Sequence, residues 1–444
     1  MALRTVIIGG DAAGMSAATR VRSARHDADV IVLERTRFTS YSACGIPFLV
    51  GGLVAGGVDA LVARSPEEHR RRGIDVRTHH EALSIDTAAG TVEYLDEHAG
   101  ETKRLGYDRL LIATGGRPIR PDLPGIDMPF IHGVQSLDDA RGLLSLADEG
   151  CRRIVVVGGG YIGLEMAEAY IERGCTATVV ERGEQPLGVV DADLGARVAD
   201  AMRAHGIDVR CRATVDGFEP GSVLTSDGPI EADLVILGIG VEARSDLAAA
   251  AGLALGPKGA IVVDERQATT VDGVWSAGDC ATSTHLVSGA TMHLPLGTYA
   301  NRHGRVAGIN MAGDHARSPG VLGTAITKLC ELEIASTGLR HDQATDADLD
   351  AVATTIDTTT VAGYLPHAST LTVRVVAERG TGRLLGAQII GGPGSAKRID
   401  TVVTAITAGM TVADVADLDL AYAPPFSSVW DPVAVAAREA LKAV

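Results

Sequence analysis

Cys44 is the residue of this chain best suited to redox chemistry, because a cysteine thiolate is a strong nucleophile. It lies ten residues after Glu34, and the other cysteines stand far away at 151, 175, 211, 280 and 330. Cys44 therefore has no partner for a CxxC or CxxxxC redox pair. Any disulfide that it forms in catalysis must join it to a small molecule, or the thiol must cycle through a sulfenic acid. The apolar segment after Cys44 predicts the start of a helix, which would lower the pKa of the thiol.

Two glycine-rich turns stand where a strand gives way to a helix. The first unit predicts a strand at 3–8, a turn at 9–14, a helix at 15–24 and a strand at 30–34. The second repeats this order with a strand at 154–157, a turn at 158–163, a helix at 164–173 and a strand at 177–181. Backbone N–H groups in such a turn, with the helix N-terminus, can hold a pyrophosphate. The sequence therefore predicts two dinucleotide-binding units.

The second turn carries the complete G-x-G-x-x-G pattern. An acid, Glu181, follows 18 residues after the last glycine of the turn, at the end of the next predicted strand. It is placed to accept a hydrogen bond from an adenosine ribose 2′-hydroxyl, which favours NADH over NADPH. The neighbouring Arg182 makes this preference moderate, so NADPH stays an alternative. The candidate residues for this nucleotide are Gly158, Gly160, Tyr161, Ile162, Gly163, Glu181 and Gly240.

The first turn departs from the pattern at its middle position. Gly9 and Gly14 hold the outer positions, but Asp11 stands between them. A side chain there crowds a pyrophosphate unless the turn is reshaped, and Gly10 can supply that freedom. A tight turn without a ligand is the alternative, which the acid at the end of the next strand disfavours. The candidate binding residues are Gly9, Gly10, Asp11, Ala12, Ala13, Gly14, Glu34 and Arg35.

The composition excludes several classes of partner. The chain has 444 residues and a net charge of −16, without a basic block long enough to follow a phosphate backbone, so we expect no nucleic acid. No apolar run reaches about 18 residues, so we expect no membrane span. The scattered cysteines show no metal-ligand spacing; we therefore expect no metal and a reducing, cytoplasmic setting. The first strand begins at once, which predicts no signal peptide.

Two further segments complete a recognisable series of motifs. Ala-Thr-Gly-Gly-Arg-Pro at 113–118 follows a predicted strand at 109–112, and Ser-Ala-Gly-Asp at 276–279 opens a region that we expect to be helical. With the two glycine turns, the chain resembles the pyridine nucleotide-disulfide oxidoreductases from residue 5 to about 432. The resemblance implies FAD in the first unit and a nicotinamide nucleotide in the second. It implies FAD contacts at Ser42, Thr114, Gly115, Asp279, Pro295, Leu296 and Gly297.

The resemblance and the alternation of predicted strands and helices together predict an α/β fold. We expect two three-layer ββα or Rossmann-like dinucleotide-binding domains and a C-terminal α+β dimerisation domain, and hence a homodimer. A proline-rich connection at 117–127 and a glycine pair near 238–240 read as the crossovers between domains. The expected domains are residues 1–117 with 243–322 for FAD, 118–242 for NAD(P)H, and 323–444 for dimerisation.

The Cys44 segment is similar to the single-cysteine branch of this family, and closest to the coenzyme A-disulfide reductases. Peroxidases and oxidases of that branch usually carry a histidine where Ala12 stands here, while Ala43 and Phe48 replace an asparagine and a tyrosine usual in the coenzyme A enzymes. Among the candidate site residues, Ser40, Arg20 and Arg22 would meet coenzyme A, and Tyr422 and Tyr364 would act with Cys44. For the arginines, which suit phosphate groups, a solvated helix face is the alternative. For Tyr364, and also for Tyr422, the alternative is a packed interface residue.

The sequence therefore predicts an FAD enzyme that uses NADH to reduce coenzyme A disulfide, or a similar small disulfide, at Cys44. Tyr422 would reach the site from the partner subunit and protonate the departing thiolate. An NADH oxidase that reduces oxygen or peroxide through a sulfenic acid is the first alternative, and a persulfide or polysulfide reductase is a second. Fused members of that last type carry a rhodanese domain, which we do not expect here. The net charge disfavours a ferredoxin-type electron-transfer reductase, because it would repel an acidic partner protein. A redox sensor without enzymatic activity is disfavoured as well, because it would leave the predicted hydride transfer from NADH to FAD without use.

Overall fold

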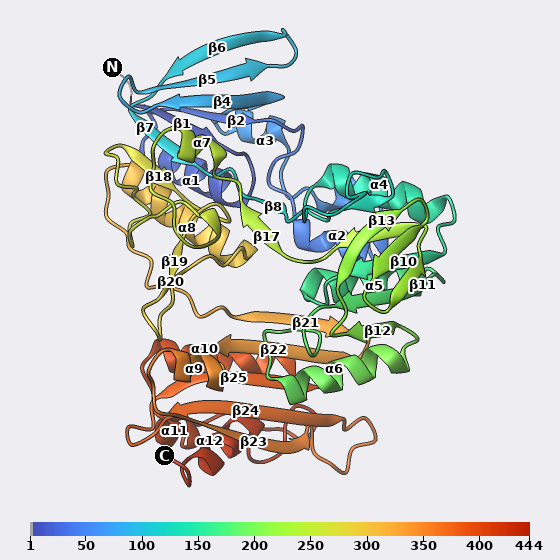
Figure 1. Ribbon diagram of the computed structural model, residues 1–444. Helices are drawn as coiled ribbons and strands as arrows, with labels where there is room; N and C mark the ends of the chain where they lie inside the picture. The colour runs from blue at the N-terminus through green and yellow to red at the C-terminus, as the bar shows by residue number, and fades with distance from the viewer. Residues whose placement is uncertain (1–2) are drawn as a thin grey trace.

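The computed structural model describes residues 3–444, so the first two residues of the first predicted domain lie outside it. Two parallel five-stranded sheets and one antiparallel five-stranded sheet form the centres of its three main units; the two parallel sheets lie beside each other, and the antiparallel sheet lies below both in Figure 1. This mixed α/β architecture confirms the predicted fold class. No helix within residues 3–444 has the length and apolar character needed to cross a bilayer.

The first parallel sheet joins strands from both ends of a long stretch of sequence. Its strand order is β18-β7-β1-β2-β3. The strands span Arg4–Ile8 (β1), Asp29–Glu34 (β2), Asp75–Thr78 (β3), Arg109–Ile112 (β7) and Val274–Ser276 (β18). The side chains of β1, β2 and β7 are buried on both faces, as parallel strands between helices require. An antiparallel sheet of β4 (His80–Asp86), β5 (Thr91–Asp96) and β6 (Glu101–Gly106) adjoins it.

Helices α1 (Ala12–Ala24) and α8 (Gly297–Met311) pack closely against each other beside this sheet (Figure 1). Glycines in α8 make the approach possible. A Cβ atom at Gly304 would lie 2.2 Å from the carbonyl oxygen of Ala13, and one at Gly308 would lie 2.7 Å from that of Ala17. Because α1 and α8 are packed so closely, the start of α8 lies beside the first glycine turn.

The second parallel sheet has the order β12-β11-β10-β16-β9. Its strands span Ile131–His132 (β9), Arg153–Val157 (β10), Thr176–Glu181 (β11), Asp208–Cys211 (β12) and Leu234–Leu237 (β16). Helices α4 (Leu137–Asp148), α5 (Tyr161–Glu172) and α6 (Ala192–Ala204) accompany it, with a small antiparallel sheet of β13 (Val215–Glu219), β14 (Ser222–Thr225) and β15 (Gly228–Glu231). Both crossovers between the two parallel sheets run side by side, because β8 (Gly116–Pro118) pairs antiparallel with β17 (Val241–Ala243).

The C-terminal sheet is antiparallel, with the order β21-β22-β25-β24-β23. The strands span Ala325–Leu329 (β21), Leu332–Gly338 (β22), Ala351–Thr359 (β23), Thr370–Glu378 (β24) and Leu384–Gly391 (β25). Its helices are α9 (His341–Asp346), α10 (Ile399–Thr407), α11 (Val412–Ala416) and α12 (Pro432–Ala440). The predicted helices at 396–408 and near the C-terminus are present.

Three local expectations need correction. Helices α1 and α5 begin at Ala12 and Tyr161, each three residues earlier than expected, because the second half of each glycine turn is already helical. The Gly278–Asp279 pair lies in a turn and opens no helix. The chain leaves this turn to pair with residue 261, whose N–H donates to the carbonyl of Cys280 at 2.8 Å.

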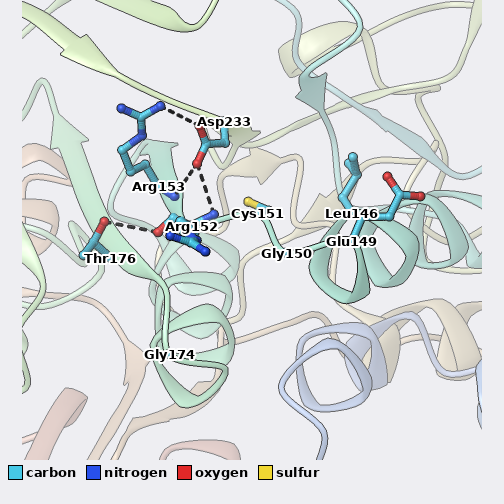
Figure 2. Close-up of a pocket in the computed structure, with 9 residues that line it drawn as sticks. All are labelled: Leu146, Glu149, Gly150, Cys151, Arg152, Arg153, Gly174, Thr176 and Asp233. Carbon is cyan, nitrogen blue, oxygen red and sulfur yellow. Dashed lines mark hydrogen bonds and ion pairs between the residues drawn. The ribbon is translucent and has the colours of Figure 1, made fainter.

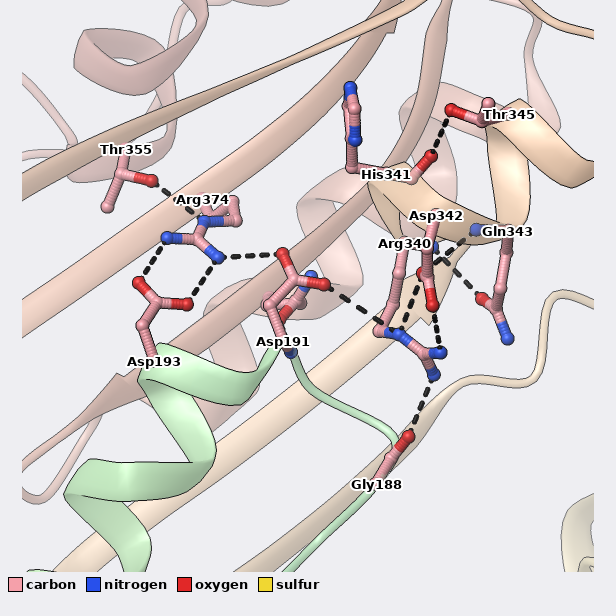
Figure 3. A network of polar contacts seen from close by, with 11 residues as sticks. Gly188, Asp191, Asp193, Arg340, His341, Asp342, Gln343, Thr345, Thr355 and Arg374 are labelled. Carbon is pink, nitrogen blue, oxygen red and sulfur yellow. Dashed lines mark hydrogen bonds and ion pairs between the residues drawn. The ribbon is translucent and has the colours of Figure 1, made fainter. Parts of the chain in front are cut away.

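A charged cluster fastens the second nucleotide unit to the C-terminal sheet (Figure 3). Arg374 on β24 donates to Asp191 at 2.7 Å and to both carboxylate oxygens of Asp193 at 2.8 and 2.6 Å. Arg340 bonds the carbonyl of Gly188 at 2.8 Å and lies 3.7 Å from Asp191. The side chains of Arg374 and Asp191 are only 13% and 18% exposed, so the ion pair between them is shielded from solvent.

We expect Arg374→Ala to lower the free energy of unfolding by about 2–4 kcal/mol, because it removes the closer of the two guanidinium groups beside the mostly buried Asp191 and leaves only Arg340 at 3.7 Å. The matched control is Arg379→Ala. That arginine pairs with Asp350 at 3.5 Å on the surface, and its loss should cost less than about 1 kcal/mol. Urea unfolding of both variants checks the difference; equal losses would contradict it.

Candidate functional site

The outer glycines of the first turn are required by backbone contacts. Gly9 has a φ of +106°, and a Cβ there would lie 2.1 Å from the carbonyl oxygen of Ala113. A Cβ at Gly14 would lie 1.9 Å from the carbonyl oxygen of Gly9. No side chain can be accommodated at such distances. The turn is thereby held against the segment that carries Thr114 and Gly115.

Asp11 occupies the middle of this turn, and one oxygen of its carboxylate contacts the Cys44 segment. Its Oδ1 accepts a hydrogen bond of 3.0 Å from the N–H of Tyr41. Burial, then the nearby carboxylates of Glu34 and Asp279, raise the pKa of Asp11 to about 7 against the hydrogen bond from Tyr41. This contact joins the first glycine turn to the segment that ends in Cys44.

The two acids at the strand ends make the same contact in both units. Glu34 accepts from the N–H of Gly10 at 2.8 Å, and its other oxygen accepts from Thr36 at 2.7 Å. Glu181 accepts from the N–H of Gly159 at 2.7 Å. Each carboxylate keeps further lone pairs for a ribose hydroxyl. Arg35, directly after Glu34, is exposed.

The segments at 114, 279 and 295–297 lie around open space beside the first turn. Asp279 has a buried Oδ1 with no hydrogen-bond partner, and burial raises the pKa of its carboxyl to about 6. No atom lies within 4 Å of a Cβ built at Gly115 or Gly297. Pro295 and Leu296 precede α8 directly. An orphaned buried acceptor beside two open glycines fits a ligand that brings hydroxyl groups, such as the polyol chain of FAD.

In the second turn the three glycines have different roles. A Cβ at Gly163 would lie 2.1 Å from the carbonyl oxygen of Gly158, and one at Gly158 would lie 2.6 Å from that of Gly238. At Gly160 the nearest atom is 3.7 Å away, which is an ordinary contact. Gly160 therefore leaves room for a ligand, whereas the other two permit the backbone to fold. Gly240, with a φ of +104°, is exposed at the crossover.

We expect Gly160→Ala to keep the melting temperature within about 3 °C of wild type but to weaken NADH binding at least about tenfold, because its methyl group fills ligand space. Gly163→Ala should instead fail to fold or lose well over 10 °C, because its Cβ meets backbone. Thermal unfolding and an NADH titration separate the two. Equal melting temperatures for both variants would contradict this division of roles.

Tyr161 and Ile162 begin α5, and both are partly exposed. Burial raises the pKa of Tyr161 to about 12, while Ser336 of the C-terminal sheet lies near enough to oppose this rise. One turn later, Glu165 accepts from Thr327 at 2.9 Å, and burial raises the pKa of its carboxyl. The sequence analysis gave Glu165 no role. Its position four residues after Tyr161, on the same face of a helix, was the available signal.

Cys44 has an exposed thiol in a short turn, Ala43–Gly45, before α2 (Ile46–Val50). Desolvation raises the pKa of this thiol, and Glu165, Asp279 and Asp11 raise it further. The prediction that the helix lowers the pKa of the Cys44 thiol is therefore wrong for the protein chain alone. A five-residue helix gives little dipole, and three carboxyl groups from distant segments oppose it.

Ser40 and Ser42 flank the Cys44 segment differently. Ser40 has a φ of +47°, and its hydroxyl lies 3.0 Å from Nε2 of the fully buried His69. Ser42 is exposed, and its N–H donates to the carbonyl of Leu61 at 2.9 Å. The sequence analysis missed Tyr41 and His69 as the anchors of this segment.

The two candidate arginines of α1 also differ. Arg22 donates to the carbonyls of His26 at 2.7 Å and Ala28 at 3.2 Å, and so fastens the chain after the helix. Arg20 is exposed. The structure thus gives Arg22 a local structural role, whereas Arg20 is free to meet a ligand in solution.

Tyr364 and Tyr422 are exposed, at 75% and 47%, on two segments that meet where the N–H of Ala362 donates to the carbonyl of Pro424 at 3.1 Å. Arg398 supports both segments through the carbonyls of Thr360 at 2.7 Å and Phe426 at 2.8 Å. The helices on either side of the Tyr422 segment, α11 and α12, lie across the C-terminal sheet from α2 (Figure 1). Within one subunit, the structure does not bring the tyrosines together with Cys44.

A depression of about 1040 Å³ lies at the other end of the second sheet (Figure 2). It borders Arg153 and Thr176, which begin β10 and β11, and an ion pair of 2.7 Å joins Arg153 to Asp233 there. The glycine turn follows the opposite ends of these strands. The depression contains none of the residues predicted to act.

Three comparisons identify what this arrangement is similar to. The family described as pyridine nucleotide-disulphide oxidoreductase matches residues 3–294, and its dimerisation domain matches residues 324–434. An NAD(P)H sulfur oxidoreductase (CoA-dependent) of Pyrococcus furiosus is 38% identical over 98% of both chains. An NADH oxidase of Methanocaldococcus jannaschii is 33% identical over 99% of both.

Two further matches are similar over nearly the whole chain. A coenzyme A disulfide reductase of Staphylococcus haemolyticus is 27% identical over 97% of both chains. The solved structure of an NAD-dependent persulfide reductase from A. fulgidus superposes with a TM-score of 0.96 at 36% identity, covering 99% of this chain and 83% of that one. The relatives thus share a framework but carry names for different acceptors.

Proposed function

This chain belongs to the pyridine nucleotide-disulphide oxidoreductases, and we propose that it uses NADH to reduce coenzyme A disulfide, or a similar low-molecular-weight disulfide, at Cys44. The observation that carries the proposal is a single exposed thiol in a site assembled from both nucleotide units. The six cysteines at 44, 151, 175, 211, 280 and 330 are all free. The disulfide must therefore come from a small molecule.

The enzyme is FAD-dependent and uses a nicotinamide nucleotide, as its family does. We place FAD on the first glycine turn, with Glu34, Arg35, Ser42, Thr114, Gly115, Asp279, Pro295, Leu296 and Gly297 around it. We place the nicotinamide nucleotide on the second turn, with Tyr161, Ile162, Glu181 and Gly240. The carboxylate of Glu181 supports NADH over NADPH, because it would repel a 2′-phosphate.

The reaction balances as RSSR + NADH + H⁺ → 2 RSH + NAD⁺. The Cys44 thiolate attacks one sulfur of the disulfide, forms a mixed disulfide and releases the first thiol. NADH and FAD, when bound, supply the two electrons that cleave this mixed disulfide and restore Cys44. Tyr422 of the other subunit gives a proton to each departing thiolate, which makes the thiol a better leaving group. We also assign Tyr364, on the adjoining segment, to this step, and Ser40, Arg20 and Arg22 to the nucleotide part of coenzyme A.

The dimerisation-domain match supports a homodimer. We propose domains at 1–117 with 243–322, 118–242 and 323–444, supported by the β8–β17 pairing at the crossovers. The six free thiols support the proposed cytoplasmic setting.

Two other acceptors are chemically close. Relatives named for sulfur and persulfide reduction favour a persulfide as the second candidate, because it contains the same sulfur–sulfur bond. A relative named NADH oxidase favours oxygen as a third, with Cys44 cycling through a sulfenic acid.

Steady-state NADH consumption with matched acceptors tests the proposal. Coenzyme A disulfide, glutathione disulfide, polysulfide and oxygen would be compared in one buffer. We expect kcat/KM for coenzyme A disulfide to exceed that for the other acceptors at least about tenfold. Mass spectrometry of the unreduced protein should show coenzyme A joined to Cys44. Turnover with oxygen or polysulfide alone would overturn the proposal in favour of the corresponding alternative.

A further inference from the structure

Asp11 stands at a point where a carboxylate and a dinucleotide would conflict. It directly precedes α1, whose N-terminus is the place where this kind of unit holds a pyrophosphate. The hydrogen bond from the N–H of Tyr41 fixes its carboxyl group at 3.0 Å. Gly9 and Gly14, on either side of Asp11, make close backbone contacts, with Ala113 and with each other, that leave no room for a side chain.

The charged surroundings of Asp11 are mostly acidic. Glu34 at the end of β2 and Asp279 after β18 both face it, and the thiol of Cys44 and the phenol of Tyr41 lie close enough to interact with its charge. Within residues 3–444, no cation is among the main influences on Asp11; Arg35 interacts instead with Tyr41, and Arg244 with Glu34. The buried Oδ1 of Asp279 has no hydrogen-bond partner in the described part of the protein, so it can accept a hydrogen bond from a ligand.

We propose that Asp11 carries a proton when FAD is bound, so that binding of the cofactor takes up one proton at this residue. An ionised Asp11 would place a third negative charge beside the two of the pyrophosphate, in a region shielded from water. A protonated Asp11 removes that repulsion, and its hydroxyl can donate a hydrogen bond to a phosphate oxygen. The hydrogen bond from Tyr41 to Oδ1 persists in both states.

The affinity for FAD should depend on pH, because Asp11 is protonated in the complex but titrates in the protein without FAD. Burial holds the pKa of Asp11 at about 7 before FAD binds, so below about pH 6 the residue is already neutral and binding takes up no proton. Above about pH 8 the free carboxylate must be protonated, and the dissociation constant for FAD should rise up to about tenfold per pH unit. Asp279, whose pKa burial raises only to about 6, has finished ionising before this range. Desolvation and nearby carboxyl groups raise the pKa of Cys44, which moves its titration away from neutral pH.

The test is a titration of the full-length protein, freed of its flavin, with FAD between pH 6 and 9. We expect the wild-type dissociation constant to rise steeply above about pH 8. Asp11→Asn keeps the shape and the hydrogen-bond donor of the neutral acid and should bind with an almost constant affinity. The matched control is Asp279→Asn, which should keep the wild-type slope above pH 8. A pH-independent wild type, or an unchanged slope in Asp11→Asn, would overturn the proposal.

A measurement on the wild type alone guards against a variant that does not refold. Calorimetric titrations with FAD at pH 8.5 in two buffers of different ionisation enthalpy count the protons taken up. We expect about one proton, and close to none at pH 6; no uptake at pH 8.5 would contradict the assignment. Neither measurement involves the disulfide substrate, so the result is independent of the acceptor proposed above.

Discussion

Cys44→Ser should abolish the reduction of coenzyme A disulfide while leaving the flavin bound. The serine hydroxyl cannot form a mixed disulfide, so we expect kcat to fall on the order of 10³-fold or more. Cys44 is an exposed residue, so the melting temperature should change little. The flavin absorbance spectrum, the melting temperature and NADH-dependent disulfide reduction would be measured on one preparation.

Cys211→Ser is the matched control for this variant. Cys211 is also free and only partly exposed, but it ends β12 at the edge of the second sheet, and desolvation raises the pKa of its thiol. Its loss should leave turnover within about twofold of wild type. Full turnover in Cys44→Ser would refute the role of Cys44. Turnover with oxygen that survives this change would show that oxygen is reduced without the thiol.

The sequence was sufficient to predict the two parallel sheets because their signals are local. A buried strand, a glycine turn, a helix and a terminal acid follow one another within about 30 residues in each unit. The same signals misplaced the starts of α1 and α5. Glycines suggested a turn up to Gly14 and Gly163, but both lie inside helices, where their missing side chains allow close backbone contacts.

The charged environment of the site could not be predicted in this way, because it depends on contacts between distant segments. Asp11, Glu165 and Asp279 come from three parts of the chain, and only the fold shows that all three raise the pKa of Cys44.

The role of Arg22 was ambiguous from the sequence. Its side chain suits a phosphate group and a helix end equally well, and the nearby carbonyls of His26 and Ala28 engage it here.

Tyr422→Phe should lower kcat for disulfide reduction about 10²- to 10⁴-fold, because the departing thiolate loses its proton donor. Flavin content and the melting temperature should stay close to wild type, since the phenol is 47% exposed in one subunit. The KM for the disulfide should change less than kcat if the hydroxyl acts on the leaving group. A kcat within about threefold of wild type would contradict this role, and Tyr364→Phe measures the contribution of the neighbouring segment.

Mixed dimers show whether Tyr422 acts on its own subunit or on the partner. Cys44→Ser and Tyr422→Phe homodimers are both expected to be nearly inactive. In a mixed dimer, a tyrosine that acts on the partner restores one complete site, with Cys44 from one subunit and Tyr422 from the other. Random exchange of equal amounts should therefore recover about a quarter of wild-type activity, because half of the dimers are mixed and each has one of two sites intact. A tyrosine that acts within its own subunit restores no site, so continued inactivity, with subunit exchange verified by mass spectrometry, would exclude the arrangement across the dimer.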